Sequence, residues 1–255
     1  EEAAAEKRQI ELSTSLLSGG CSRSCPPAPG GPHPGYAEGG GRVRQLLYLL
    51  HHPYARGRVR SLPVPTAVEQ TRALAAEGYR EIVVTGIEIS SWGQDLKNGE
   101  TLIDLLEAVC TAAPAVRIRL GSLEPRTITE EFCRRAAALP NLCPQFHLSM
   151  QSGCDDTLKR MNRKYDTARY YESIKLLREV FQHPAITTDL IVASPRRRTD
   201  EFAQTLAFLR RCAFSSMHIF PYSRRPGTPA AAMEGQIPRH VQEDRARRAA
   251  AVAAE

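Results

Sequence analysis

Apolar residues follow two different periods along this chain. From residue 64 onward, apolar residues spaced three or four apart predict helices, and short unbroken apolar runs predict strands buried on both faces. The predicted strands are REIVVTG (80–86), VRIRLGS (116–122), PQFHLSM (144–150), AITTDLIVA (185–193) and SSMHIFPYS (215–223). The predicted helices cover 64–78, 101–113, 128–139, 154–162, 167–181, 199–212 and 237–255.

This order of elements predicts an α/β fold. Repeated strand–helix units form a parallel sheet covered by helices. Five strands follow residue 80, and a sixth is expected at 45–50, so we expect a barrel or open barrel rather than a doubly wound sheet. Thr129 is expected to cap the helix that follows it.

Polar and glycine residues gather where the predicted strands end. The carboxyl ends of barrel strands carry the active site in this class of fold. The residues at these ends include Thr85, Gly86, Glu124, Gln151, Ser152, Gly153 and Tyr222. Between apolar neighbours, His147 is interpreted as a hydrogen-bonded core histidine, and Trp92 either stacks on a base or packs.

The first fifty residues lack the regular spacing of apolar residues that is seen after residue 64. Residues 1–17 predict a charged helix, and residues 18–42, dominated by Gly, Pro and Ser, predict irregular structure. The chain opens mid-helix without an initiator Met, which suggests a fragment.

Composition narrows the function classes. The 255 residues are 42% hydrophobic and 24% charged, which is ordinary for a globular domain, and the net charge of +6 favours an anionic partner such as nucleic acid. An apolar run of about 18 residues, as a membrane span requires, is missing. The 7 cysteines are odd in number and scattered, which indicates free thiols in a reducing cytoplasm.

Several motifs together resemble the radical S-adenosylmethionine (SAM) methylthiotransferases. They are PYARGRVRS, GYREIVVTGIEISSWGQDL, RIRLGSLEP, FHLSMQSGCDDTLKRMNRKY, AITTDLIV and HIFPYSRRPGTPAA, in order from residue 53 to about 232. The ARGRVRS stretch favours the branch that acts on threonylcarbamoyladenosine in tRNA, beside the anticodon.

This resemblance implies a partial TIM-like barrel of six strand–helix units, a [4Fe-4S] cluster held by a C-x3-C-x2-C motif, and SAM as cofactor. It implies tRNA and a sulfur donor as partners. Residues 53–235 would be the core, 1–17 a linker helix from an N-terminal domain, and 236–255 a helix leading to an RNA-binding domain. The implied cofactor-binding residues are Thr85, Gly86, Glu124, Gln151, Ser152, Gly153, Arg163 and Tyr222.

The cluster motif is missing from the printed sequence. Its three cysteine columns hold Val43, Leu47 and Leu50, whose alkyl side chains cannot ligate iron. Reading the codons one base out of frame restores a cysteine at each column. We therefore interpret residues 18–52 as translated out of frame by two compensating single-base changes. A diverged, cluster-free protein is the competing interpretation.

A second departure lies in the loop IVASPRRRTDEF, where the family has Gly-Phe-Pro-Gly-Glu near the SAM. Ala193, Ser194, Arg196 and Arg197 replace four of these residues. Taken literally, three arginines would face a site built for a zwitterionic cofactor. Two other functions stay open: a catalytically dead remnant that binds RNA or a partner, and a barrel enzyme acting on a phosphorylated small molecule.

Overall fold

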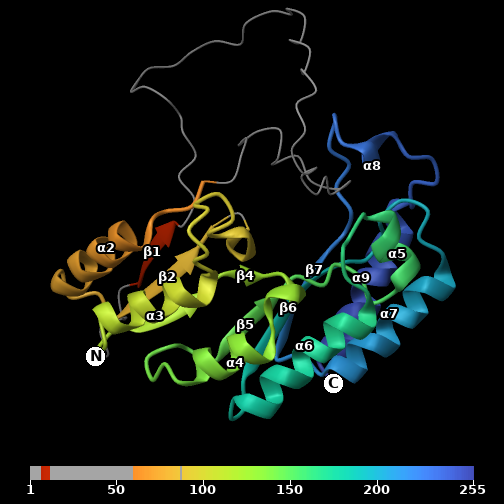
Figure 1. The fold of residues 1–255 in the computed structure, drawn as a ribbon. Helices are drawn as coiled ribbons and strands as arrows, with labels where there is room; N and C mark the ends of the chain where they lie inside the picture. The colour runs from red at the N-terminus through yellow and green to blue at the C-terminus, as the bar shows by residue number, and fades with distance from the viewer. Residues whose placement is uncertain (1–6, 12–59, 87) are drawn as a thin grey trace, which may run out of the picture.

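A computed structural model describes residues 7–11, 60–86 and 88–255 of the chain (Figure 1). The strands are β1 (Lys7–Glu11), β2 (Glu81–Thr85), β3 (Arg117–Leu120), β4 (Ser122–Leu123), β5 (Gln145–Leu148), β6 (Ala185–Ile191) and β7 (Ser216–Phe220). The α-helices are α2 (Val64–Ala76), α3 (Leu102–Ala112), α4 (Glu130–Ala137), α5 (Asp155–Arg160), α6 (Thr167–Val180), α7 (Thr199–Cys212), α8 (Pro229–Ala232) and α9 (Arg239–Ala253), and two 3-10 turns are η1 (Ile89–Ser91) and η2 (Pro125–Thr127).

The strands are parallel and follow one another in space in chain order. One sheet has the order β1-β2-β3 and the other β4-β5-β6-β7. A single residue, Gly121, separates β3 from β4, and a bridge between Ile118 and Leu142 links the two halves. The described strands thus form an open, partial barrel, which confirms the predicted fold class.

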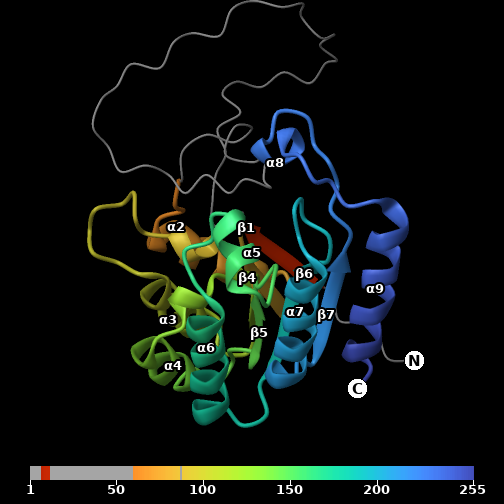
Figure 2. The ribbon, with the colours of Figure 1, turned by 90° about the vertical axis from the view of Figure 1, so that its right-hand side faces the viewer.

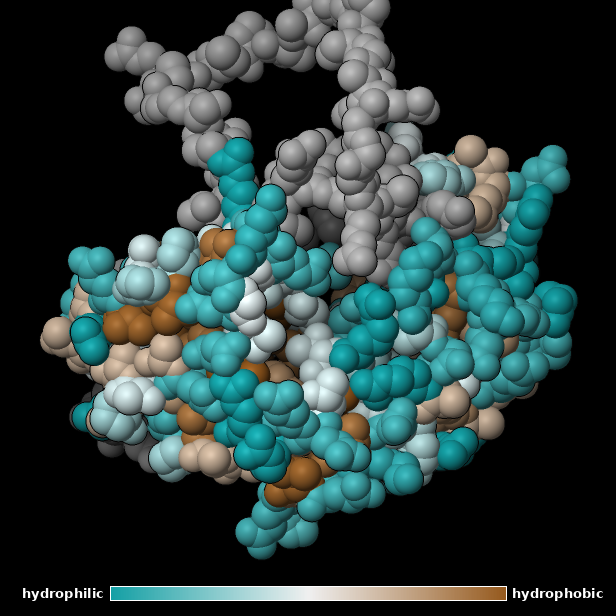
Figure 3. Space-filling view, viewed as in Figure 1, coloured by the Kyte–Doolittle hydropathy of each residue, from teal (hydrophilic) through white to brown (hydrophobic). Residues whose placement is uncertain are grey.

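Alternation along the strands explains why helices cover one side of the sheet. In β6, alternate residues such as Ile186, Thr188 and Leu190 are buried and the others are partly exposed. The buried row packs against the helices, so the other row faces the inside of the barrel. Figure 2 shows α3, α4, α6 and α7 along the outer side of the strands. Figure 3 shows mainly hydrophilic residues on the face viewed in Figure 1.

Helix starts follow the local sequence. Thr129 accepts a hydrogen bond from the backbone N–H of Phe132 (3.1 Å), which confirms its predicted role as the cap of α4. Asp166 caps α6 in the same way, through the N–H of Arg169 (2.8 Å). Among the described residues, no helix has both the length and the apolar character needed to cross a bilayer.

The helix predicted over residues 1–17 is wrong where the structure describes it. Lys7–Glu11 is a β-strand that pairs in parallel with β2, with Lys7 opposite Glu81 and Glu11 opposite Thr85. Helix propensity is a weak local preference, and the backbone hydrogen bonds of the neighbouring strand override it. The strand expected at 45–50 and the segment 18–52 lie outside the described residues.

Candidate active site at the strand ends

The predicted rim residues lie at the same end of the barrel. Thr85 is the last residue of β2, Glu124 follows β4, Gln151 lies beyond β5 and Tyr222 lies beyond β7. Since the strands are parallel, their carboxyl ends meet at one edge of the sheet. The structure therefore places these four rim segments at the same end of the barrel, and what they bind stays a prediction.

Opposite charges gather at this rim around Glu124. Its carboxylate accepts a hydrogen bond from Arg126 (2.8 Å), and its backbone N–H donates to the Ser90 hydroxyl (2.8 Å). Desolvation by the surrounding chain, and next the negative charge of Glu124, raise the pKa of Glu88, although the residue as a whole is exposed. A side-chain hydrogen bond with Ser91, and then the positive charges of Arg163 and Arg126, act on the pKa of Glu88 in the opposite direction. Two acids and two guanidinium groups therefore share one polar cluster.

Tyr165 lies under this cluster. Its hydroxyl donates to the carbonyl oxygens of Ser149 (2.6 Å) and Met150 (3.2 Å), just beyond β5. Burial raises the pKa of Tyr165 to about 12, so the phenol stays protonated at neutral pH. Tyr165 therefore ties the Arg163 segment to the end of β5. Sequence reasoning missed both Tyr165 and Glu88, although an acid two residues after Gly86 was a usable signal.

The three residues after β5 differ in burial: Gln151 is partly exposed, whereas Ser152 and Gly153 are buried. Gln151 has a left-handed backbone (φ 65°) and exchanges hydrogen bonds with β6: its N–H donates to Asp189 O (2.8 Å), and the N–H of Ile191 donates to Gln151 O (3.0 Å). Ser152 is fully buried, and its hydroxyl accepts from the N–H of Cys154 (3.3 Å). Only Gln151 stays partly exposed at the rim.

Gly153 lies against α7. A Cβ atom at this position would be 2.8 Å from Cδ1 and 2.9 Å from Cβ of Phe208. Such contacts are closer than real Cβ atoms make, and Phe208 is itself buried. The structure therefore gives this glycine a packing function, and its predicted contact with a cofactor remains untested.

We expect Gly153→Ala to lower the free energy of unfolding by about 1–3 kcal/mol, because the added methyl group overpacks the contact with Phe208. Urea unfolding followed by circular dichroism measures this. In a Phe208→Leu background the same substitution should cost clearly less. Equal costs in both backgrounds would show that crowding by Phe208 is not the reason for glycine here.

Among the remaining rim residues, Thr85 packs closely against Gly121. A Cβ atom at Gly121 would be 3.0 Å from the Thr85 hydroxyl, so the end of β2 fits tightly against the junction of β3 and β4. Gly86 continues the chain from β2 and is partly exposed. Tyr222 is half-buried, and burial raises its pKa.

The three arginines of the loop after β6 do not face one site, contrary to the literal interpretation of the sequence. Arg197 is only 1% exposed, and its guanidinium donates to Ile191 O, to the Ser152 hydroxyl and to the Thr205 hydroxyl. Arg196 and Arg198 are largely exposed and pair with acidic residues. These three acceptors offset part of the cost of burying the Arg197 guanidinium, although its Nε has no hydrogen-bond partner and burial lowers its pKa to about 10.

Trp92 is also buried. It is 4% exposed, and its indole N–H donates to Leu62 O (3.0 Å). Its packing alternative is therefore confirmed, and stacking on a base would require the ring to leave the core.

The cysteines in the described part of the chain do not form a cluster site. All five are buried, and they lie in separate places: Cys110 in α3, Cys133 in α4, Cys143 before β5, Cys154 before α5 and Cys212 in α7. A [4Fe-4S] cluster needs several thiolates converging on one point. The columns with cluster spacing hold Val43, Leu47 and Leu50, outside the described residues, and their side chains have no donor atom. The described residues, and the three alkyl side chains in the cysteine columns, therefore do not fit the cluster.

The family follows from a comparison with known proteins. A family model described as the Radical SAM superfamily matches residues 16–209. The chain belongs to the radical SAM superfamily. This superfamily's cofactors are a [4Fe-4S] cluster and SAM, so the alkyl residues in the cysteine columns are a departure within an otherwise matching domain.

Individual radical SAM enzymes extend this result. The chain is 38% identical over 192 residues to a threonylcarbamoyladenosine tRNA methylthiotransferase of Thermotoga maritima, covering 75% of this chain and 44% of that protein. It is 36% identical over 193 residues to a tRNA-2-methylthio-N(6)-dimethylallyladenosine synthase of Clostridium botulinum, covering 76% of this chain and 43% of that protein. The chain thus spans less than half the length of these relatives.

A solved structure supports the fold. The radical SAM enzyme coproporphyrinogen III oxidase from Escherichia coli superposes with a TM-score of 0.53 at 16% identity, covering 71% of this chain and 42% of that chain. At this identity the likeness concerns the fold alone. It agrees with the open parallel barrel described above.

Proposed function

We propose that this chain is the core of a tRNA methylthiotransferase, the enzyme class that places a methylthio group on a modified adenosine of tRNA. The observation that carries this proposal is the group of rim segments at the carboxyl ends of parallel strands. Their motifs resemble the methylthiotransferases, and two relatives of this class are 36% and 38% identical to the chain. We infer tRNA and a sulfur donor as partners, and the cytoplasm as the compartment.

For the nucleoside we propose threonylcarbamoyladenosine beside the anticodon. The ARGRVRS stretch supports this choice over dimethylallyladenosine. Relatives with either substrate in their names have similar identities, at 34–38% for those matched here. The two substrates therefore have to be compared directly.

The charged rim supports SAM as the cofactor of the intact enzyme. SAM carries an ammonium and a carboxylate group, and the rim offers both acidic and basic partners: Glu88 and Glu124, and Arg126 and Arg163. In a partly buried site such pairs would orient the methionyl end of the ligand. Thr85 and Gly86 are the residues predicted to meet the methionyl end, and Gln151, Ser152, Gly153 and Tyr222 are predicted to bind the cofactor at the other strand ends.

The printed sequence requires a second part to this proposal. A chain with Val43, Leu47 and Leu50 in the cysteine columns would hold no cluster and would be inactive as a radical enzyme. We propose that its coding sequence carries two compensating frame changes, upstream of about residue 33 and near residue 52. The alternative function, a cluster-free remnant that binds RNA or a partner, is favoured by the same three alkyl residues if the frame is correct.

Resequencing the DNA across codons 17–54 tests the frame, and the restored chain tests the function. We expect two single-base differences, and after anaerobic reconstitution with iron and sulfide about four irons per restored chain. The restored chain should cleave SAM, whereas the printed chain should stay colourless. Hypomodified tRNAs carrying threonylcarbamoyladenosine or dimethylallyladenosine then identify the nucleoside.

The control is the restored chain with one of its three cysteines replaced by alanine, which should lose the cluster. A confirmed printed frame would support the remnant. A restored chain that binds a cluster but cleaves SAM without preference for either tRNA would leave the superfamily intact and contradict the proposed substrate.

A further inference from the structure

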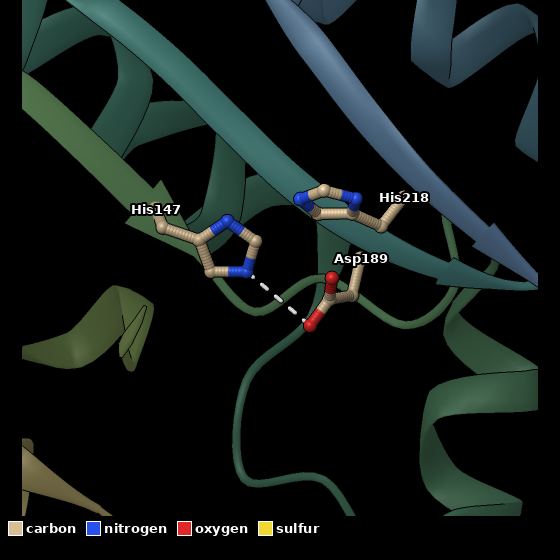
Figure 4. A group of neighbouring side chains, drawn as sticks. All are labelled: His147, Asp189 and His218. Carbon is tan, nitrogen blue, oxygen red and sulfur yellow. Dashed lines mark ion pairs between the residues drawn. The ribbon is translucent and has the colours of Figure 1, made fainter. Parts of the chain in front are cut away.

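Two histidines and an aspartate lie together on the inner face of the barrel. In β5, Phe146 and Leu148 are buried on the helix side, so His147 between them faces inward. The same alternation places Asp189 of β6 and His218 of β7 on the inner face. Asp189 and His218 are direct partners in the β6–β7 register. Figure 4 shows the three side chains converging from neighbouring strands.

The donor atoms of this triad are close enough to share one ion. His147 Nε2 is 3.2 Å from Asp189 Oδ2, and one ligand atom from each of the three residues lies within 4.8 Å of the others. An ion with bonds of about 2.0–2.2 Å needs its donor atoms within roughly 4.4 Å of one another. His218 is exposed, and the site requires its side chain to move slightly so that all three donor atoms come within this range.

A hydrogen-bond chain orients the His147 ring. Its Nδ1 is 3.0 Å from the Thr187 hydroxyl oxygen, which also accepts from Gln145 Nε2 (3.2 Å). A hydroxyl oxygen has two lone pairs and can accept from both groups. When Nδ1–H donates to Thr187, the lone pair of Nε2 points toward Asp189. Histidine ligands of metals are held by this kind of second hydrogen bond.

The Asp189 carboxylate is 26% exposed and has no arginine or lysine partner among the described residues. In the described part of the chain, the ion pair of Asp189 is with His147 alone, which is charged only if protonated. Arg119, on the same inner face, is engaged by Glu81 (3.0 Å) and by Gln145 (3.2 Å). A bound divalent ion would neutralise Asp189 without protonating either imidazole.

We propose that His147, Asp189 and His218 form a binding site for one divalent first-row transition ion such as zinc. Two imidazoles and a carboxylate suit this class of ion, and three protein ligands leave a coordination position open. That position faces the inside of the barrel. The site is separate from the cluster motif, because it uses no cysteine and lies wholly within the strands β5 to β7.

Zinc and cobalt(II) titrations of the full printed chain test the site. After chelator treatment and dialysis, the tag-free protein should bind one zinc per chain, and cobalt(II) should give the visible absorption of a nitrogen–oxygen site. His218→Ala and Asp189→Asn should each weaken zinc binding by at least tenfold. Thr187→Val, which removes the support of His147, should weaken it by about tenfold.

Matched controls separate this site from other ligands. His240→Ala changes an exposed histidine of α9 and should leave the affinity unchanged. A Cys21→Ser and Cys25→Ser double variant should also bind normally, and the cobalt(II) spectrum should lack thiolate charge-transfer bands. Circular dichroism and the urea midpoint verify that each variant is folded.

Three results would overturn the proposal. They are no stoichiometric zinc binding by the wild-type chain, equal affinity in the folded His218→Ala variant, or a cobalt(II) spectrum dominated by thiolate bands. The first result would leave a hydrogen-bonded His147–Asp189 pair without metal. The test is independent of the proposed function, because it needs neither SAM nor tRNA.

Discussion

Phe202→Ala should lower the free energy of unfolding by about 4 kcal/mol, because it removes a fully buried ring and leaves a cavity. The ring lies in α7 and is surrounded by guanidinium groups: Arg197, Arg245 and Arg248 have their Cζ atoms 5.3–5.4 Å from its centroid. Cations near an aromatic face are attracted by its electrons, and more strongly when partly desolvated. Truncation would therefore remove both packing and this attraction. Urea unfolding followed by circular dichroism provides the measurement.

Two variants divide this effect into its parts. Phe202→Leu keeps most of the volume but removes the aromatic face, and it should cost about 1–2 kcal/mol. Phe220→Ala makes the same change at a ring that is 50% exposed, and it should change stability by no more than about 0.5 kcal/mol. If Phe202→Leu cost as little as Phe220→Ala, the arginines would contribute nothing through the ring.

Glu201→Gln should lower the free energy of unfolding by about 2–3 kcal/mol. This is less than the usual cost of removing one partner of a fully buried ion pair, because Arg160 keeps 30% exposure. The Glu201 carboxylate is fully buried. It accepts from Arg160 (2.6 Å) and from the backbone N–H of Arg198 (2.9 Å). The substitution leaves the positive charge of Arg160 without its carboxylate. Asp200→Asn, an exposed neighbour in the same turn, is the matched control and should cost less than about 1 kcal/mol.

The pH dependence of the free energy of unfolding provides a second test of the contribution of the Glu201 carboxylate. Burial acts to raise the pKa of Glu201, but the hydrogen bonds from Arg160 and the Arg198 backbone outweigh burial, and the pKa lies below its ordinary value. The folded state therefore holds its proton less tightly than the unfolded state does. The stability from this group is present above the unfolded pKa and is lost as the pH falls through the folded pKa. Glu201→Gln should flatten this acid limb, and an unchanged limb would contradict the assignment.

The sequence predicted the fold well from residue 64 onward because the signals there are local. Strands β2, β5 and β6 lie within predicted apolar runs, and Thr129 marks a helix start by its own hydrogen bond. β1 was missed because its pairing with β2 spans about seventy residues and its composition favours a helix. No local pattern reports a hydrogen bond made by a distant strand.

The rim segments could be predicted because each is recognisable beside its own strand. The inner-face triad could not, because its members are far apart in sequence and meet only through the strand register. His147 was expected in the core, since alternation alone does not say which side of a strand faces the helices. It is hydrogen-bonded as expected, but it lies on the inner face. Likewise, Arg197 was expected at the rim, and only its partners show that it is buried.

The reactivity of the buried cysteines can report which part of the fold opens. Desolvation raises the pKa of Cys133 to about 11, and that of both Cys110 and Cys212 to about 12. Thiolates, not thiols, react with alkylating agents and oxidants, so these sulfurs are protected twice, by lack of access and by protonation. Their elements differ: Cys110 is in α3, Cys133 in α4 and Cys212 in α7. The order in which they become alkylated under mild denaturant would therefore reveal which part of the barrel opens first.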